Sequence, residues 1–400
     1  MKNRTIALAA TALAAVALTF AACSDTQTGP TPPDSLTPGL AKGGTTKPVR
    51  SISVIPSSAT IVIGGRVQLT ANASPANSAP SFVWASTNQA VATVSQTTGL
   101  VTGVAAGTAI IHATAGGKTG TATVTVLTAP PAGSEVLVGA GDIASCSNTG
   151  DEATAALLDN IAGTVFTLGD NAYESGTSTE YTNCYGPSWG RHKSRTKPTP
   201  GNHEYNTGSP SGYFGYFGSA AGSPDQGYYS YNLGDWHIIV LNSNSNCGAI
   251  SCALGSAQDT WLRADLAANT KLCTLAYWHH PRFNSGAGHG NNTNVAPFWN
   301  ALFQYNADVV LNGHEHVYER FAPQRPDATP DAANGIRQFT VGTGGREHYS
   351  FKATPEPNSE VRNATADGVL KLTLRTNGYD WEFVPAGGAT FTDSGTGTCH

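Results

Sequence analysis

The sequence carries little charge: only 12% of its 400 residues are Asp, Glu, Lys or Arg, and it contains a single Met. The formal net charge is −5, and the basic residues form no tract. Binding to a nucleic-acid backbone requires clustered Lys and Arg, so this composition argues against nucleic acid as the main partner. The 45 Gly and 23 Pro instead favour a β-rich, turn-rich protein over a helical bundle.

The seven cysteines include no Cys-x-x-Cys pair, which argues against a zinc–thiolate site. Six of them follow the N-terminal segment, and an even number in an exported protein predicts disulfides. Cys247 and Cys252 close a short loop and are the favoured pair. The pairs Cys146–Cys184 and Cys273–Cys399 would follow, although the sequence leaves other connectivities open.

The N-terminal residues are typical of an export signal. Two basic residues precede an apolar run, residues 5–20, and Ala21-Ala22 then precede Cys23. This ending resembles the bacterial lipoprotein signal, in which residues 1–22 are removed and Cys23 is lipidated. The alternatives are ordinary signal cleavage beside a chance Cys, or a retained membrane helix. We expect an exported protein, anchored through Cys23 at the periplasmic face of the outer membrane or at the cell surface.

Two regions of contrasting composition follow. Residues 23–48 are rich in Pro, Thr and Gly and read as a lipid-anchored linker. Residues 49–127 are short β-branched runs separated by turn residues, with apolar residues alternating at Val67, Leu69 and Ala71. Several short strands with Trp84 in an early one predict a β-sandwich.

The run VWASTNQAVATVSQTTGLVTGVAAGTAIIHATAG, residues 83–116, resembles the bacterial Ig-like domains of group 2. That resemblance implies a spacer or an adhesive unit, with possible contacts to surfaces or carbohydrate. Because residues 49–127 contain no cluster of titratable side chains, we expect catalysis elsewhere.

After a hinge at residues 128–135, the pattern of residues 136–400 alternates between strands and helices. Five apolar runs each end in polar residues: EVLVGAGD, GTVFTLGD, WHIIVLNSN, LCTLAYWHH and ADVVLNGHEH. Two segments have helical spacing, DEATAALLDNI and AQDTWLRADLAAN. Apolar strands that deliver polar side chains at their carboxyl ends predict an α/β sheet with an active-site edge.

The polar residues at these ends include carboxylates, an amide, a phenol and several imidazoles. Each alone is compatible with a turn or a strand end. Together they form a set of oxygen and nitrogen ligands suited to a pair of metal ions such as iron, zinc or manganese. They are Asp142, Asp170, Asn171, Tyr173, the Gly-Asn-His-Glu of 201–204, His279, His280, His314 and His316.

The string GD…GDNAY…GNHE…WHH…GHEH resembles the calcineurin-like metallophosphoesterases over about residues 136–395. Most of that superfamily begins with Asp-x-His, whereas this chain has Asp142-Ile143-Ala144. Tyr173, three residues after Asp170, and the Tyr-Glu-Arg of GHEHVYER resemble purple acid phosphatases, in which a tyrosinate replaces that histidine. The resemblance implies a four-layer α/β domain, two mixed sheets flanked by helices. It also implies Fe(III) beside a divalent Fe, Zn or Mn.

Carried over to this sequence, the family pattern implies two ligand sets. Asp142, Tyr173 and His316 would hold one metal, and Asn202, His279 and His314 the other. Asp170 would bridge the two. His279 is preferred to His280 because of the His-x-Pro pattern.

Four further residues are predicted to act beside the metal ligands without binding metal themselves. The resemblance places His203 and His289 beside the substrate. Glu204 and Glu319 would hydrogen-bond the ligand groups.

The resulting prediction is a phosphatase that hydrolyses small phosphomonoesters by in-line attack of a metal-bound hydroxide. One alternative is a phosphodiesterase acting on nucleotide or lipid-derived substrates. Another is an adhesive or binding protein with an inactive phosphoesterase fold. Aromatic residues of the segment 209–232 could stack on a substrate or simply pack; they are Tyr213, Phe214, Tyr216, Phe217, Tyr228 and Tyr229.

Overall fold

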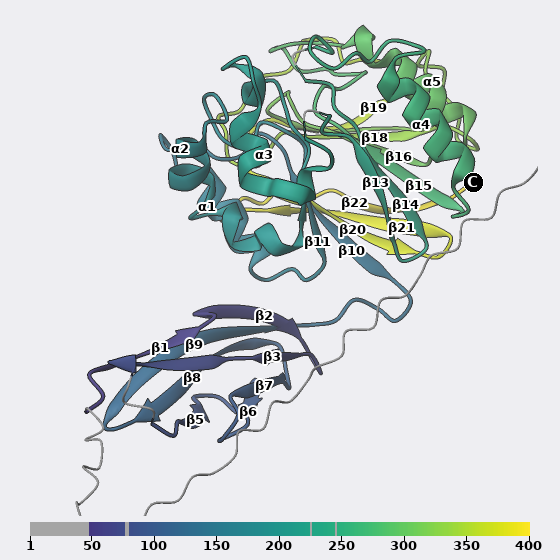
Figure 1. Cartoon of the computed structure of the whole chain (residues 1–400). Helices are drawn as coiled ribbons and strands as arrows, with labels where there is room; N and C mark the ends of the chain where they lie inside the picture. The colour runs from purple at the N-terminus through teal and green to yellow at the C-terminus, as the bar shows by residue number, and fades with distance from the viewer. Residues whose placement is uncertain (1–47, 77–79, 225, 245) are drawn as a thin grey trace, which may run out of the picture. The chain divides into compact units, whose positions relative to one another are not determined.

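The computed structural model describes residues 48–400 except 77–79, 225 and 245 (Figure 1). The predicted export signal, Cys23 and all of the predicted linker except Pro48 lie outside the described residues. No helix among the described residues is both long enough and apolar enough to span a bilayer.

The first domain is a β-sandwich, as the alternating pattern predicted. Its strands are β1 (Ser51–Ile55), β2 (Ser58–Val62), β3 (Arg66–Gln68), β4 (Thr70–Ser74), β5 (Val83–Ser86), β6 (Ala92–Val94), β7 (Leu100–Gly103), β8 (Gly107–Ala115) and β9 (Lys118–Leu127). They form sheets of order β1-β4, β2-β9-β8-β5 and β3-β7-β6. In β9 every second side chain, Ala122, Val124 and Val126, is buried against Trp84 and its neighbours.

The second domain is built on two mixed sheets. The first, of order β12-β11-β10-β20-β21-β22, contains β10 (Glu135–Ala140), β11 (Thr164–Thr167), β12 (Thr196–Lys197), β20 (Gly368–Arg375), β21 (Gly378–Pro385) and β22 (Ser394–Thr398). The second, of order β13-β14-β15-β16-β18-β17-β19, contains β13 (Tyr229–Leu233), β14 (Trp236–Val240), β15 (Cys273–Tyr277), β16 (Val309–Asn312), β17 (Tyr318–Phe321), β18 (Arg337–Val341) and β19 (Ser359–Asn363). Strand β10 starts at Glu135, the last residue of the predicted hinge, because Glu135 pairs with Leu374.

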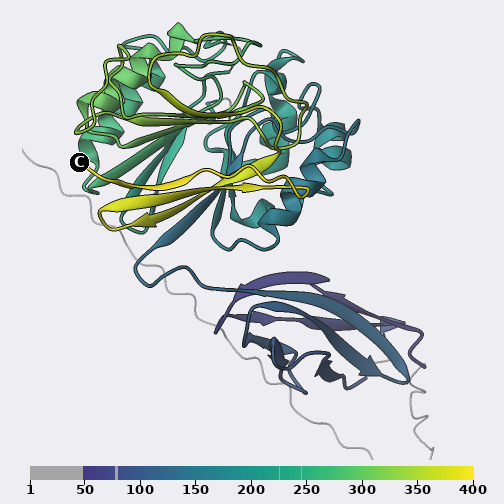
Figure 2. The same ribbon diagram turned by 180° about the vertical axis from the view of Figure 1, so that it is seen from behind.

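Helices flank the two sheets on both sides (Figures 1 and 2). They are α1 (Gly150–Leu158), α2 (Ser178–Glu180), α3 (Ser211–Phe217), α4 (Ala257–Ala268) and α5 (Ala296–Gln304), with a π-helical turn at Tyr181–Tyr185 and 3₁₀ turns at Trp189–Arg195, His203–Tyr205, Gly218–Ala221 and Thr293–Val295. The predicted four-layer arrangement of two mixed sheets flanked by helices is confirmed.

The period-two alternation of the central strands explains this layering. In β16, Val309 and Leu311 belong to the core shared by the two sheets, whereas Val310 belongs to the core beneath α4 and α5. Strand β14 divides in the same way, with Ile238 in the first core and Ile239 in the second. These strands are apolar on both faces because both faces are covered.

Three disulfides lie in the second domain: Cys146–Cys184, Cys247–Cys252 and Cys273–Cys399. The predicted pairing is confirmed. The longest link joins the start of β15 to the segment after β22. It therefore ties the C-terminal strand of one sheet to the centre of the other.

The aromatic side chains of the segment 209–232 pack into the domain. Tyr213 and Phe217 of α3 are buried in the first core, with Phe214 and Tyr216 partly buried against it. Tyr213 and Phe217 make an edge-on contact with ring centroids 5.3 Å apart. The sequence left open whether these side chains stack on a substrate or pack within the domain, and in the structure they pack.

Candidate metal centre

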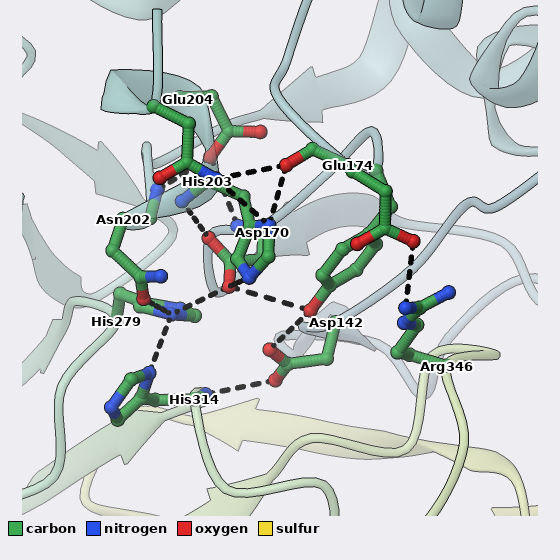
Figure 3. Close-up of polar contacts among 12 residues, drawn as sticks. Asp142, Asp170, Glu174, Asn202, His203, Glu204, His279, His314 and Arg346 are labelled. Atoms are coloured by element: carbon green, nitrogen blue, oxygen red, sulfur yellow. Dashed lines mark hydrogen bonds and ion pairs between the residues drawn. The ribbon is translucent and has the colours of Figure 1, made fainter. Parts of the chain in front are cut away.

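Strand ends assemble the candidate site at one edge of the paired sheets. Asp142 follows β10, Asp170 follows β11, His279 follows β15 and His314 follows β16. Figure 3 shows Asp170 between Asp142 and His279, with Asn202 and His314 beside His279. The carboxyl edge of parallel strands is where α/β proteins place their ligands.

The first predicted ligand set converges on the Tyr173 hydroxyl. This oxygen lies 3.0 Å from Asp142 Oδ1, 3.2 Å from His316 Nε2 and 3.3 Å from Asp170 Oδ2. His316 Nε2 is also 3.5 Å from Asp142 Oδ1. Four donor atoms of the types that hold a trivalent or divalent ion therefore lie close together.

The second set converges on His279 Nε2. It lies 3.0 Å from Asn202 Oδ1, 3.1 Å from Asp170 Oδ2 and 3.2 Å from His314 Nδ1. Asp170 Oδ2 thus belongs to both sets, which is the position that a bridging carboxylate requires. The structure brings together all seven predicted ligands; metal binding by them stays a prediction.

The ring nitrogens and carboxylate oxygens that point away from the centre form hydrogen bonds with the backbone. His279 Nδ1 donates to the Leu168 carbonyl at 2.6 Å, and His316 Nδ1 donates to the Glu347 carbonyl at 2.7 Å. These bonds point each Nε2 toward the centre. Although burial lowers it, the Asp170 carboxylate raises the pKa of His279 to about 9, so His279 Nε2 would have to give up a proton to a bound ion. The outer oxygens of Asp142 and Asp170 accept from the amides of His314 and His203, both at 2.8 Å.

Three of the seven residues adopt a backbone conformation that non-glycine residues rarely occupy. The φ angles are 59° for Asp142, 50° for Asp170 and 71° for His314. Such conformations cost free energy and persist where the surroundings enforce them, typically at functional sites. At the neighbouring Gly201 an added Cβ would collide with the Asp170 carboxylate, so only glycine fits there.

The electrostatics of the centre favour a bound cation. Burial raises the pKa of Asp142 to about 8, and the Asp170 carboxylate adds to this rise. Burial and both of these carboxylates raise the pKa of the Tyr173 phenol well above its usual range. Burial lowers the pKa of His316 to about 4, so its imidazole is neutral and can donate a lone pair. A cation would relieve the repulsion among the acidic groups, so the residues fit the predicted metals.

Glu204 supports the loops that carry Asp170 and Asn202, as predicted. It is fully buried and accepts hydrogen bonds from the amides of Asp170, Asn171 and Gly201, at 3.0, 2.8 and 2.6 Å. The Tyr181 hydroxyl donates to the same carboxylate at 3.1 Å.

The predicted role of Glu319 is wrong. Its carboxylate accepts from the Ser285 amide at 2.9 Å and from the Ser359 hydroxyl at 2.6 Å, and it contacts no predicted ligand.

Glu315, which sequence reasoning missed, lies between His314 and His316 and is fully buried. It accepts from the amides of Gly288 and His289 at 2.6 and 2.9 Å, so it holds the glycine-rich loop that carries His289. Its position between the two histidines of the His-x-His motif was the sequence feature that could have identified it.

The two predicted substrate-side histidines lie beside different predicted ligands, His203 beside Asp170 and His289 beside His314. His203 Nε2 is 3.8 Å from Asp170 Oδ2, and its Nδ1 lies 2.7 Å from the Glu174 carbonyl. His289 stacks on His314 with ring centroids 3.9 Å apart and is 40% exposed. His280, the alternative to His279, has its Nδ1 2.8 Å from Ser243 Oγ, and its ring centroid is 4.3 Å from that of His314. His279, His280 and His314 form a group whose ligand atoms all lie within 4.8 Å of one another, so His280 remains close enough to serve as a ligand.

Arg346 is a second residue that sequence reasoning missed. Its guanidinium lies over the Tyr173 ring, 4.7 Å from the centroid. It pairs with Glu174 at 2.7 Å (Figure 3). It also donates to the Ser145 hydroxyl at 3.1 Å. A single Arg in a glycine-rich segment gave no pattern from which this position could be found.

Comparisons with known proteins agree with both domains. Residues 48–126 match the bacterial Ig-like domain (group 2), and residues 137–318 match the calcineurin-like phosphoesterase family. Purple acid phosphatase 22 of Arabidopsis thaliana is 32% identical over 154 residues, which are 36% of this chain and 34% of that protein. Purple acid phosphatase 15 of the same plant is 28% identical over 216 residues, 45% of this chain and 40% of that protein. The chain thus spans about a third to two fifths of the length of these relatives.

A solved structure shows the same likeness at the level of the fold. A purple acid phosphatase from yellow lupin seeds superimposes with a TM-score of 0.53 at 16% identity, covering 83% of this chain and 68% of that one. The chain therefore consists of an Ig-like domain followed by a metallophosphoesterase-type α/β domain that is similar to purple acid phosphatases.

Proposed function

We propose that this protein is a phosphatase that uses two metal ions to hydrolyse small phosphomonoesters. The observation that carries the proposal is the sharing of Asp170 Oδ2 by two donor sets, one around Tyr173 and one around His279. Asp142, Tyr173 and His316 would hold one ion, and Asn202, His279 and His314 the other. When bound, the two ions would neutralise charge on the phosphoryl oxygens and make an attacking water more acidic.

The chain's own groups complete the chemistry around the phosphoryl group. His203 Nδ1–H donates to the Glu174 carbonyl, which directs Nε2 to the side of the centre where Asp170 lies. A proton held at that Nε2 would pass to the leaving oxygen. His289, half-exposed beside His314, would hydrogen-bond a phosphoryl oxygen.

The Tyr173 hydroxyl provides a spectroscopic test of the first donor set. Protein loaded with ferric iron should show a visible charge-transfer band, and Tyr173→Phe should abolish it because the phenolate is its source. Absorption spectra of the iron-loaded variant and of a Tyr379→Phe control, altered at a buried tyrosine outside both donor sets, make the comparison. A band that survives in Tyr173→Phe would contradict this assignment.

The proposal includes an exported, membrane-anchored location. Its support is the sequence before residue 24, where an apolar run and Ala21-Ala22 precede Cys23. Lipidation of Cys23 would hold the phosphatase at a membrane surface, with the Ig-like domain as a spacer or a surface-contacting unit. Labelling with a radioactive fatty acid in cells should mark the wild type and not Cys23→Ser; equal labelling would contradict the anchor.

A further inference from the structure

A cavity of about 260 Å³ adjoins the candidate metal centre on the side of His314. Its wall includes His289 and His314, whose rings stack on each other. Because His314 belongs to the second donor set, a group bound in this cavity would lie beside the phosphoryl group of a substrate. This volume is below the range of about 300–1,000 Å³ that is usual for ligand pockets. It suits one small group better than a nucleotide or an acyl chain.

Most of the remaining wall consists of neutral side chains that form hydrogen bonds. They are Asn246, Asn291, Asn292, Thr293 and Asn294, and we call this cavity the asparagine pocket. Asn291, Thr293 and Asn294 are exposed, and within the described part of the chain their Nδ2, Oγ1 and Oδ1 atoms, respectively, have no hydrogen-bond partner in the protein. An incoming ligand would therefore meet one donor, one acceptor and one hydroxyl that can act as either.

The wall is held in place by contacts between its two segments. The buried Asn292 donates through Nδ2 to Asn246 Oδ1 and accepts from the Asn294 amide at 3.0 Å. Asn294 Nδ2 donates to the Asn246 carbonyl at 3.3 Å, and the Cys247–Cys252 disulfide directly follows Asn246. A wall already fixed by its own bonds loses little conformational freedom when a ligand binds.

The charged side chains near the pocket already form hydrogen bonds within the protein. The Lys352 ammonium, close to Gly290, donates to the Asn284 carbonyl at 3.1 Å and lies 3.5 Å from Glu356. Glu315, behind His289, is fully buried and saturated by amide donors. The described residues that line the pocket include no Phe, Tyr or Trp, and the Tyr349 ring, 5.4 Å from that of His289, lies outside this lining. A neutral group rich in hydroxyls matches this wall better than a charged or an aromatic one.

We propose that the asparagine pocket binds the leaving group of a phosphomonoester of a sugar or a similar polyol. This inference rests on the function proposed above and gives it a substrate class. The hydroxyls of such a leaving group would exchange hydrogen bonds with Asn291, Thr293 and Asn294 while its phosphate reaches the metal centre.

The test compares two substrates on the exported form of the protein, glucose 6-phosphate and p-nitrophenyl phosphate. The variant Thr293→Val keeps the shape of the side chain and removes a hydroxyl that holds no part of the wall. The ratio of kcat/KM for the sugar phosphate to that for the aryl phosphate should fall about 2- to 10-fold, as expected for one lost hydrogen bond. A matched variant at another exposed threonine, Thr270→Val, should leave this ratio unchanged.

The outcomes separate the two proposals. A selective fall in the ratio supports the asparagine pocket, whereas misfolding would lower both rates together and leave the ratio constant. If the wild type cleaves both substrates and the variant keeps the wild-type ratio, the pocket assignment is overturned and the phosphatase stands. If the metal-loaded wild type cleaves neither substrate, the proposed function is overturned, and the pocket assignment falls with it.

Discussion

Asp170→Asn should lower kcat/KM for phosphomonoester hydrolysis by about a thousandfold, more than any other single substitution in the centre. Asp170 Oδ2 lies 3.3 Å from the Tyr173 hydroxyl and 3.1 Å from His279 Nε2, so one atom serves both donor sets. The amide keeps the shape of the side chain and its contact with the His203 amide but loses the negative charge. Removing a single electrostatic group from an active site commonly costs about 10²–10³ in rate, and this one would act on both proposed ions.

Steady-state kinetics with a chromogenic phosphomonoester, together with metal content per chain, would measure the effect. Asp380→Asn is the matched control, because Asp380 is on β21 and pairs with Arg375. Near-wild-type hydrolysis by Asp170→Asn would contradict the bridging role.

Glu204→Ala should lower the free energy of unfolding of the second domain by about 3–5 kcal/mol. The variant leaves the buried amides of Asp170, Asn171 and Gly201 without an acceptor. Unsatisfied buried donors are costly because the unfolded chain hydrogen-bonds them to water. Since the same amides position the Asp170 and Asn202 loops, metal affinity should fall as well.

Denaturant unfolding of the two proteins and metal titration would check both effects. Glu382→Ala is the control, because Glu382 lies on β21 and pairs with Lys371 at an exposed position. Wild-type stability in Glu204→Ala would show that water replaces the carboxylate, and Glu204 would then have no structural role.

The sequence best predicted the positions of the site residues where a polar residue directly follows an apolar strand. Asp142, Asp170, His279 and His314 each end an apolar run, and parallel strands necessarily bring such ends to one edge. The pairing of Asp142 with Tyr173 and of Asn202 with His279 came from the family resemblance. No spacing in the sequence specifies which loops meet.

Other features depend on tertiary contacts that have no local pattern. Glu319 and Glu315 both lie near the His-x-His motif, and only the path of the 285–289 loop decides that Glu315 faces His289. The C-terminal strands β20 and β21 pair with each other over their full length, yet their segments carried no motif and were not predicted. Arg346 reaches Tyr173 from a loop far along the chain, so long-range folding alone places it.

Metal-dependent hydrolysis is the most direct test of the central claim. The protein would be assayed with a chromogenic phosphomonoester and phosphodiester as purified, after chelation and after metal is restored, with bound metal measured each time. We predict two metal ions per chain, monoester cleavage that disappears on chelation, and recovery when metal returns. Diester cleavage alone would keep the centre and change the substrate class. Monoester hydrolysis that persists in fully metal-free protein would contradict the dinuclear centre.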